Sequence, residues 1–492
     1  DESGVTVKPA DGLWGKTTGE TIQAVLEREG ADADVLAIGP AGERLVRFAC
    51  CCHYWKNREA IAGRGGMGAV LGSKQVKAVA VRGKFRTEVA DPAALKAVVE
   101  GTREDMKKGT HGLKVYGTPV LVNPINALGG LGWRNMQGEV VPDVDRISGE
   151  TYKEHFWARD TTCLKCSVAC GKTFEVKDGE WTGLRWKLPE FETIFSTIFA
   201  LGTLNAHVDA AALVKGEELC DQYGLDTISM GVTIAFANEA FERGILTERE
   251  TGVPLRFGDP RLVLRLIEMT ASRSGFGDWL AEGSDRLAAR LGLERTREFL
   301  YTAKGLEMPA HSPRALKGMA MGYATATRGG SHHDARPTPT YAKVVDRFST
   351  ADKPAFACRS QHFTAVGDSL VLCRFTAERG LGLFLNENYR KVIAAVTGWD
   401  CSLEEVEAMG ERIYTLERAY NCREGVRRAD DTLPYRVLHV PIPEGPSKGM
   451  HCPPEELDPL LSEYYRLRGW DGDGVPPPGT LRHLGLDFAI AR

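Results

Sequence analysis

Three closely spaced cysteines constrain this chain more than any other feature of its sequence. Cys163, Cys166 and Cys170 are separated by two and then by three residues. Thiolates at these spacings can bind three corners of a [4Fe–4S] cluster, and the fourth ligand must then come from elsewhere in the fold. A structural zinc site is the alternative, although such sites usually consist of two separate CxxC pairs. We therefore expect a cluster, which in a large protein normally transfers electrons.

Size and composition indicate a multi-domain enzyme. The 492 residues are 43% hydrophobic and 26% charged, which is typical of a globular chain able to enclose a large cofactor. No apolar run is long enough to span a bilayer, so we expect no membrane association. The net charge of −4 and the scattered basic residues argue against nucleic acid as a partner. Thiolates kept reduced for a cluster predict a cytoplasmic protein.

The first ninety residues carry β-strand signals. Residues 35–38 and 45–48 are predicted to form two strands around a tight turn at 39–42, and residues 77–82 a further strand. Between them, the glycine-rich stretch 62–70 is predicted to be a loop that runs into a helix, and its glycines permit close approach to a ligand.

Beyond residue 91 the apolar spacing becomes helical, and the later half is predicted to be mostly helix and loop. The predicted helices cover 92–110, 189–222, 226–246, 259–275 and 277–291.

A six-residue pattern occurs twice. Residues 221–226 and 368–373 each begin with an aspartate and end with leucine followed by Asp226 or Cys373. A carboxylate makes strong hydrogen bonds to the amino and ring N–H groups of a pterin, which would explain the acid that begins each copy. Two ordinary helix ends with an aspartate cap are an equally good explanation of the pattern alone.

These motifs resemble the tungsten-containing aldehyde ferredoxin oxidoreductase family, in which two such turns hold two pterins and the second turn supplies the last cluster cysteine. The resemblance covers nearly the whole chain. Other similar segments are 13–16, 62–68, 72–74, 304–309, 322–330, 421–425 and 464–470.

The resemblance implies an α+β multi-domain fold. Residues 1–88 would form part of a base domain with a mixed β-sheet that cradles the pterins. Two largely α-helical domains would follow, at 89–300 and 301–492. Family members normally begin with a further stretch, so we expect that this chain starts inside the base domain and lacks some pterin contacts.

The resemblance also assigns roles to individual residues. The cluster ligands would be Cys163, Cys166, Cys170 and Cys373. The pterin-binding residues would be Asp221, Gly224, Leu225, Asp226, Asp368 and Leu372. The loop whose backbone faces a pterin phosphate and a bridging Mg²⁺ would be Ala62, Gly63, Arg64 and Gly65. The catalytic pair would be one of Glu190 and Glu192 with one of His332 and His333.

The implied reaction is oxidation of an aldehyde to a carboxylic acid at a tungsten or molybdenum bis-molybdopterin. Glutamate suits proton removal, and a neutral histidine can donate a hydrogen bond to the carbonyl oxygen. A cluster accepts one electron at a time, so ferredoxin or a ferredoxin-like subunit is the expected partner of a homo-oligomer or complex. No dinucleotide-binding fingerprint is present.

Two other functions remain as alternatives. One is a tungsten benzoyl-CoA reductase subunit, disfavoured by the segments 322–325 and 328–332, and the other is a non-catalytic iron–sulfur subunit, disfavoured by the paired acids. Two features depart from the family pattern. Val371 replaces a glycine of the second turn, and the run Cys50-Cys51-Cys52-His53 has no counterpart. A second metal site at this run is a weak alternative, because adjacent residues rarely converge on one ion.

Overall fold

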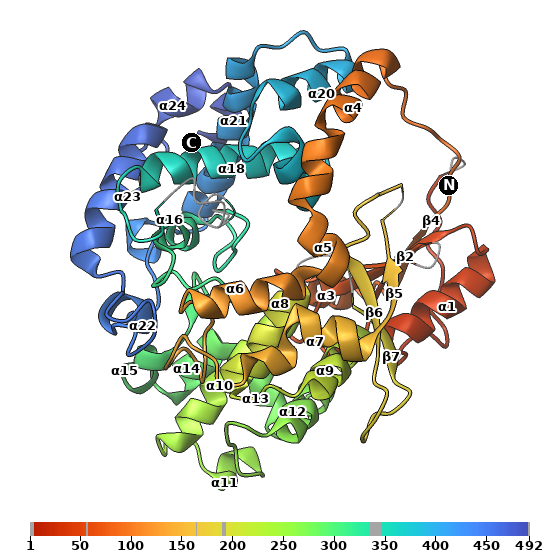
Figure 1. Cartoon of the computed structure of the whole chain (residues 1–492), viewed down its shortest axis with the longest axis vertical. Helices are drawn as coiled ribbons and strands as arrows, with labels where there is room; N and C mark the ends of the chain where they lie inside the picture. Colours follow the sequence, from red (N-terminus) through yellow and green to blue (C-terminus); the bar gives the residue numbers. More distant parts are fainter. Residues whose placement is uncertain are drawn as a thin grey trace.

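The computed structural model describes residues 4–55, 58–163, 165–188, 193–334, 338 and 346–490. Helices predominate, and the strands labelled in Figure 1 lie on one side of the molecule, beside the N-terminal helix α1 (Thr18–Glu29). The C-terminal helices lie on the opposite side (Figure 1).

A four-stranded sheet forms the N-terminal part. Its order is β3-β2-β1-β4, and every pair is antiparallel. The expected mixed sheet is therefore wrong for the part of the chain that the structure describes. Only two residues separate β2 from β3, and a parallel pair would need a much longer crossover. The strands and short helices are β1 (Asp34–Ile38), α2 (Pro40–Glu43), β2 (Cys51–Trp55), β3 (Arg58–Ala62), α3 (Met67–Ser73) and β4 (Ala78–Val81).

Three predictions for this region are confirmed and one is wrong. Strands β1 and β4 are present, and helix α3 follows the glycine-rich loop. The predicted strand at 45–48 does not form. Pro40 starts helix α2 instead of a hairpin turn, because its fixed φ suits the first helical position. The second strand begins at Cys51, so the cysteine run lies at the start of β2 and in the residue before it.

Two smaller sheets follow. The order β5-β6-β7 is antiparallel, and the loop with the three clustered cysteines connects β5 to β6. The strands are β5 (Trp157–Thr161), β6 (Gly171–Glu175), β7 (Arg185–Leu188), β8 (Thr302–Ala303) and β9 (Leu306–Glu307).

Helices make up most of the remainder. Those before residue 300 are α4 (Pro92–Gly109), α5 (His111–Tyr116), α6 (Val122–Ala127), α7 (Gly149–Thr151), α8 (Thr193–Thr197), α9 (Ala210–Tyr223), α10 (Thr227–Glu242), α11 (Glu248–Thr251), α12 (Pro260–Ser272), α13 (Gly277–Leu280), α14 (Ser284–Leu291) and α15 (Leu293–Thr296). Those after it are α16 (Lys317–Thr325), α18 (Lys353–Ser369), α19 (Arg374–Thr376), α20 (Glu387–Thr397), α21 (Leu403–Arg423), α22 (Tyr435–His439), α23 (Pro454–Arg468) and α24 (Pro478–His483).

The helices predicted at 92–110, 226–246 and 259–275 are confirmed as α4, α10 and α12. Two longer predictions are wrong because the chain breaks within them. Ala206 has a left-handed φ of 61° between α8 and α9, and Gly283 has a φ of 83° between α13 and α14. Residues 189–192 of the first prediction lie outside the described ranges.

Helix α10 is the centre of the core. Its residues from Thr227 to Ala240 are all buried. A helix that is packed against other elements on every side holds in place the segments attached to its two ends. Its N-terminus is the end of the first acidic turn, so that turn is held by the core. Within the described residues, no single helix is long and apolar enough to cross a membrane, although one sharply bent pair, Phe195–Asn205 with Ala210–Tyr223, passes by length and composition.

Candidate functional site

The first acidic turn joins α9 to α10. Asp221 is buried in the last turn of α9, and Gly224 follows with a left-handed φ of 75°. The N–H of Leu225 donates to the carbonyl oxygen of Cys220 at 2.8 Å, the bond that typically closes a helix ending in a left-handed residue. Asp226 then caps α10 with its side chain.

The second acidic turn has the same backbone geometry. It follows α18, and Val371 takes the left-handed position with φ 53°. The N–H of Leu372 donates to the carbonyl oxygen of Gly367 at 2.9 Å, and Cys373 occupies the position before α19 that Asp226 occupies before α10. The repeated sequence pattern thus corresponds to a repeated turn.

Helix capping does not explain the acid that begins each turn. Asp221 and Asp368 lie near the C-terminal ends of their helices, where the helix dipole disfavours a negative charge. Of the acids in the two turns, only Asp226 acts as an N-cap. An acid kept at an unfavourable helix end fits a ligand that presents N–H donors, as a pterin does.

The glycine-rich loop meets the first turn through Arg64. Its Nε donates to Asp226 Oδ2 at 3.0 Å, and its two terminal nitrogens donate to the carbonyl oxygens of Gly330 at 2.7 Å and Glu307 at 2.6 Å. Arg64 therefore ties the loop to α10, to β9 and to the segment before the predicted catalytic histidines. A Cβ at Gly65 would meet no atom within 4 Å, so the loop edge is open enough for an anion to approach the backbone beside Ala62 and Gly63.

The two predicted histidines lie against each other and against a third. The ring centroids of His332 and His333 are 4.7 Å apart, and those of His311 and His332 are 5.5 Å apart. Phe195 closes the row at 5.5 Å from His311. Both His311 and His332 are buried. The sequence analysis missed His311, although it stands two residues after the segment 304–309 that the family resemblance had marked. Glu190 and Glu192 lie outside the described residues.

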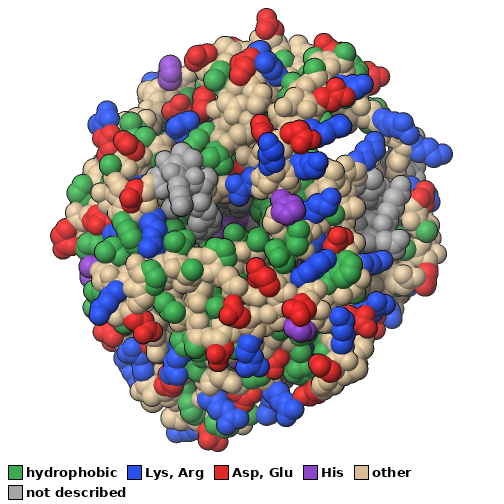
Figure 2. Space-filling view, in the orientation of Figure 1, with side chains coloured by type: hydrophobic (Ala, Val, Ile, Leu, Met, Phe, Trp, Pro, Cys, Tyr) green, Lys and Arg blue, Asp and Glu red, His purple; other side chains and the backbone are tan. Residues whose placement is uncertain are grey.

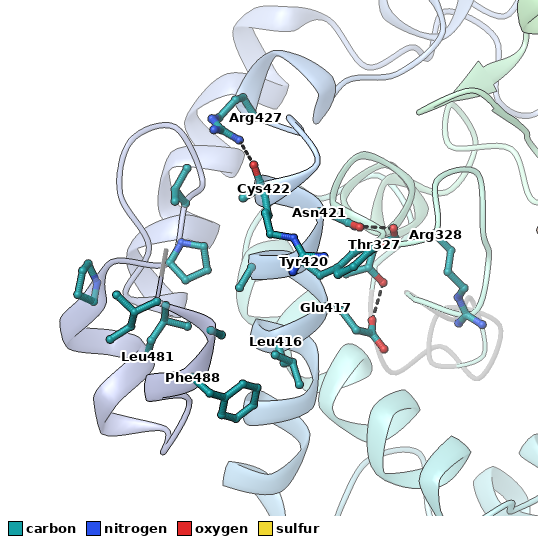
Figure 3. Close-up of a pocket in the computed structure, with 17 residues that line it drawn as sticks. Thr327, Arg328, Leu416, Glu417, Tyr420, Asn421, Cys422, Arg427, Leu481 and Phe488 are labelled. Carbon is teal, nitrogen blue, oxygen red and sulfur yellow. Dashed lines mark hydrogen bonds between the residues drawn. The ribbon is translucent and has the colours of Figure 1, made fainter. Parts of the chain in front are cut away.

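Acids surround Arg328, which precedes the histidines. Its Nη2 lies 3.6 Å from Asp334 Oδ2 and 4.0 Å from Asp368 Oδ2. Burial raises the pKa of Asp334, and Arg328 opposes this shift. Burial likewise raises the pKa of Glu417, whose Oε2 accepts a hydrogen bond from Thr327 at 2.6 Å (Figure 3). The second turn and the histidine segment thus share one charged group.

A pocket of about 1030 Å³ lies behind this segment. Its walls are α21 and the C-terminal stretch, with Leu416, Leu481 and Phe488 among the lining side chains (Figure 3). It reaches the histidine segment only through Thr327 and Arg328, so we do not place the chemistry there.

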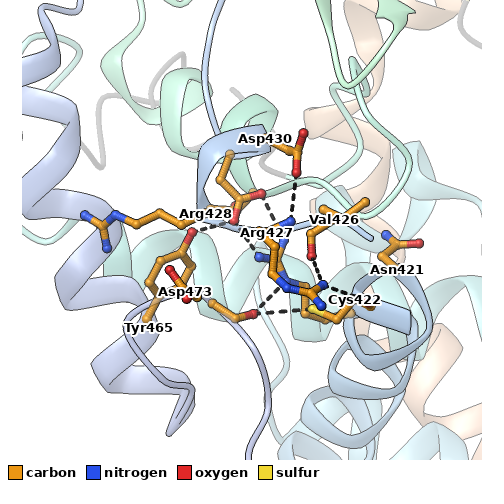
Figure 4. A network of polar contacts seen from close by, with 12 residues as sticks. Asn421, Cys422, Val426, Arg427, Arg428, Asp430, Tyr465 and Asp473 are labelled. Carbon is orange, nitrogen blue, oxygen red and sulfur yellow. Dashed lines mark hydrogen bonds and ion pairs between the residues drawn. The ribbon is translucent and has the colours of Figure 1, made fainter. Parts of the chain in front are cut away.

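A polar network fixes one wall of this pocket. Arg427 donates to the carbonyl oxygen of Val426 at 2.8 Å, and its own N–H donates to Asp430 Oδ2 at 2.8 Å (Figure 4). The N–H of Arg428 donates to the carbonyl oxygen of Asp473 at 2.9 Å. These bonds join the end of α21 to the loop after α23.

The cysteine loop is shaped by two residues with left-handed φ, Lys165 at 59° and Ala169 at 51°. Cys166 Sγ accepts a hydrogen bond from the N–H of Val168 at 3.4 Å. The four predicted ligands are half-buried, and none of them forms a disulfide in the described structure. Among the described residues, however, no three His, Cys, Asp or Glu side chains come close enough to hold one metal ion, so the structure does not itself bring any three of these four cysteines together as ligands.

The run at Cys50–Cys52 packs against the first acidic turn. The N–H of Cys50 donates to the carbonyl oxygen of Gly224 at 2.9 Å, and Cys52 Sγ lies 3.5 Å from the carbonyl oxygen of Asp221. Contact with Cys52 and burial raise the pKa of Cys50, and burial raises the pKa of Cys51 to about 11. Buried, protonated thiols are inert, which argues for packing at this run and against a second metal site.

Comparisons with known proteins agree with the motifs. A family model described as aldehyde ferredoxin oxidoreductase, domains 2 and 3, matches residues 94–486, and the N-terminal domain of the same family matches residues 1–83. A tungsten-containing aldehyde ferredoxin oxidoreductase of Pyrococcus abyssi is 38% identical over 504 residues, which cover 99% of this chain and 79% of that protein. A protein of the same name from Thermococcus kodakarensis is 38% identical over 500 residues, which cover 98% of this chain and 78% of that protein.

More distant relatives carry names that indicate other functions. An aliphatic sulfonate oxidoreductase, WOR-like subunit, of Pyrococcus furiosus is 28% identical over 481 residues, covering 92% of this chain and 70% of that protein. The solved active site complex BamBC of benzoyl coenzyme A reductase with 1,5-dienoyl-CoA has a similar fold, with a TM-score of 0.77, 24% identity, and coverage of 99% of this chain and 79% of that one.

Proposed function

The chain belongs to the aldehyde ferredoxin oxidoreductase family, and from this premise we propose that it oxidises aldehydes to carboxylic acids with a ferredoxin as electron acceptor. The active metal would be tungsten or molybdenum in a bis-molybdopterin, with electrons leaving through one [4Fe–4S] cluster. The observation that supports this most is the pair of matching turns, each begun by an acid that capping does not explain.

The residues present suit these groups. Asp221, Gly224, Leu225 and Asp226 would hold one pterin, and Asp368 and Leu372 the other. The open backbone from Ala62 to Gly65 would face the pterin phosphates and their Mg²⁺. Cys163, Cys166, Cys170 and Cys373 would bind the cluster.

The overall reaction converts an aldehyde and water into a carboxylic acid, two protons and two electrons. When bound, the metal supplies a Lewis acid and accepts the electron pair. His332, buried between two other imidazoles, would donate a hydrogen bond to the carbonyl oxygen as negative charge develops there. Glu190 or Glu192 would take a proton, and His333 would orient His332.

The proposal is tested with protein purified without oxygen. Elemental analysis should find iron together with tungsten or molybdenum. A panel of aliphatic, aromatic and sugar-derived aldehydes should reduce benzyl viologen and yield the matching acids. A protein that contains iron but neither tungsten nor molybdenum would contradict the enzymatic proposal and would favour a non-catalytic electron-transfer subunit. Turnover of benzoyl-CoA or of an aliphatic sulfonate in place of every aldehyde would assign the chain to the chemistry named for its more distant relatives.

A further inference from the structure

We infer that the α4–α5 corner, defined as residues 106–117, is the docking site of a small one-electron carrier with an acidic face. The inference rests on the proposed function, because it takes the four cysteines as ligands of one cluster. The corner is where the two cluster-bearing segments meet, and its exposed charges are basic.

One side of the corner is bonded to the cysteine loop. Lys172 Nζ donates to the carbonyl oxygens of Lys114 and Ala169, each at 2.8 Å. Gly117 packs so closely on the loop that a Cβ there would lie 3.0 Å from the carbonyl oxygen of Cys170. The end of α5 therefore lies directly against the last of the three clustered cysteines.

The other side packs on the segment that follows Cys373. A Cβ at Gly109 would lie 3.0 Å from the side chain of Arg379, and one at Gly380 would lie 3.3 Å from Met106. Arg379 and Gly380 belong to the helical turn η7 (Ala377–Leu381). The N–H of Ala377, at the start of η7, donates to the carbonyl oxygen of Cys373 at 2.9 Å, so the corner packs on the segment bonded to the fourth predicted ligand.

The corner and the cysteine loop expose only positive charge. Neither 106–117 nor 162–172 contains an aspartate or glutamate. Two exposed acids, Glu104 and Asp105, directly precede the corner on α4, and the corner and the loop together still carry an excess of lysines. Two other nearby acids are paired, Asp160 with Lys172 at 3.0 Å and Asp368 with Arg328 at 4.0 Å. Over α4 and α5, Figure 2 shows several blue side chains and a purple imidazole, with red side chains among them on α4. The exposed basic and titratable residues are Lys107, Lys108, His111, Lys114 and Lys165.

An exposed apolar side chain stands close in sequence to the fourth predicted ligand. Val371 is 90% exposed and stands two residues before Cys373. A β-branched residue is disfavoured at its φ of 53°, so neither packing nor backbone preference explains the valine. Strain of this kind is retained at functional sites. A small apolar contact with a charged rim is the anatomy of a transient electron-transfer interface.

Charge complementarity identifies the occupant. A basic patch over an electron-exit site accelerates encounter with an acidic partner and repels a basic one. The partner that fits is therefore a small iron–sulfur protein that presents carboxylates around its own cluster.

The first test compares two acceptors in the holoenzyme. The double variant Lys107→Glu, Lys108→Glu should lower kcat/KM for an acidic [4Fe–4S] ferredoxin about tenfold or more at low ionic strength, and salt should diminish the difference. Turnover with benzyl viologen should not change. The exposed Lys448→Glu serves as control and should affect neither acceptor. Equal ferredoxin kinetics in both variants would overturn the docking site.

The second test measures binding without turnover. Surface plasmon resonance with immobilised ferredoxin should show weaker binding for the double variant and for Val371→Gly, which also removes backbone strain and should therefore fold. If the double variant misfolds, Lys107→Gln, Lys108→Gln replaces it. Weakened binding in a protein that oxidises no aldehyde would refute the proposed function and keep the docking site. Aldehyde oxidation together with unaltered ferredoxin binding in the variants would keep the proposed function and refute the docking site.

Discussion

The imidazole of His311 lies against that of His332, with ring centroids 5.5 Å apart. Because His311 is buried and its ring contacts that of the predicted catalytic histidine, it can set the orientation of that ring. We predict that His311→Phe keeps the metal but lowers aldehyde kcat about tenfold and changes the kcat–pH profile, since acid–base groups control both. The exposed His155→Phe should leave both unaltered. A profile identical to that of the wild type would limit His311 to packing.

His332 should matter more than either neighbour. We predict that His332→Asn retains tungsten or molybdenum and loses about 10²- to 10⁴-fold in turnover, the usual cost of removing an acid–base group. His333→Asn should lose far less. Steady-state kinetics with metal analysis of both proteins would check this, and the opposite ranking would transfer the catalytic role to His333.

The cluster assignment predicts a specific loss in Cys166→Ala. The variant should lose the visible absorbance of the cluster and electron delivery to ferredoxin, because a cubane needs all four thiolates. The control Cys401→Ala removes a buried thiol outside the motif and should retain the spectrum. An intact spectrum in Cys166→Ala would refute its role as a ligand.

Arg64 joins three segments, so its replacement should loosen all of them. Lysine in its place can keep the ion pair with Asp226 but cannot also reach the carbonyl oxygens of Gly330 and Glu307. We predict that Arg64→Lys lowers the free energy of unfolding by about 2 kcal/mol. It should also lower the pterin content on purification. Arg28→Lys, which affects one exposed bond to Asp11, is the control. Unchanged urea unfolding and pterin content would exclude this positioning role.

Stability should fall in mild acid because of His207. Burial lowers the pKa of this imidazole to about 4, so it is neutral in the folded protein at pH values where the unfolded chain already binds a proton. Stability should therefore be constant above pH ~6.5 and decrease by roughly 3 kcal/mol towards pH ~4. Unfolding of His207→Gln should lack this component. An identical pH dependence in the variant would assign the acid sensitivity to other groups.

Local patterns predicted much of the fold correctly. The apolar spacing of α4, α10 and α12 and the β-branched run of β4 are decided by residues near one another in sequence. The errors fall at positions where single residues override such patterns. Pro40 turned an expected hairpin into a helix start, and Ala206 and Gly283 broke two expected helices. The antiparallel order of the first sheet depends on β4 pairing with β1, a contact between residues more than forty positions apart.

By itself, the sequence determined the family, the cysteine motif and the two acidic turns. The motif and the turns each consist of residues within a few positions, so their geometry is a local property of the backbone. Only the tertiary structure brought His311 to His332, turned the side chain of Arg64 inward to three other segments, and placed the α4–α5 corner between Cys170 and the turn after Cys373. These contacts join residues tens to hundreds of positions apart. They are set by how the helices pack around a shared core, which no short stretch of sequence encodes.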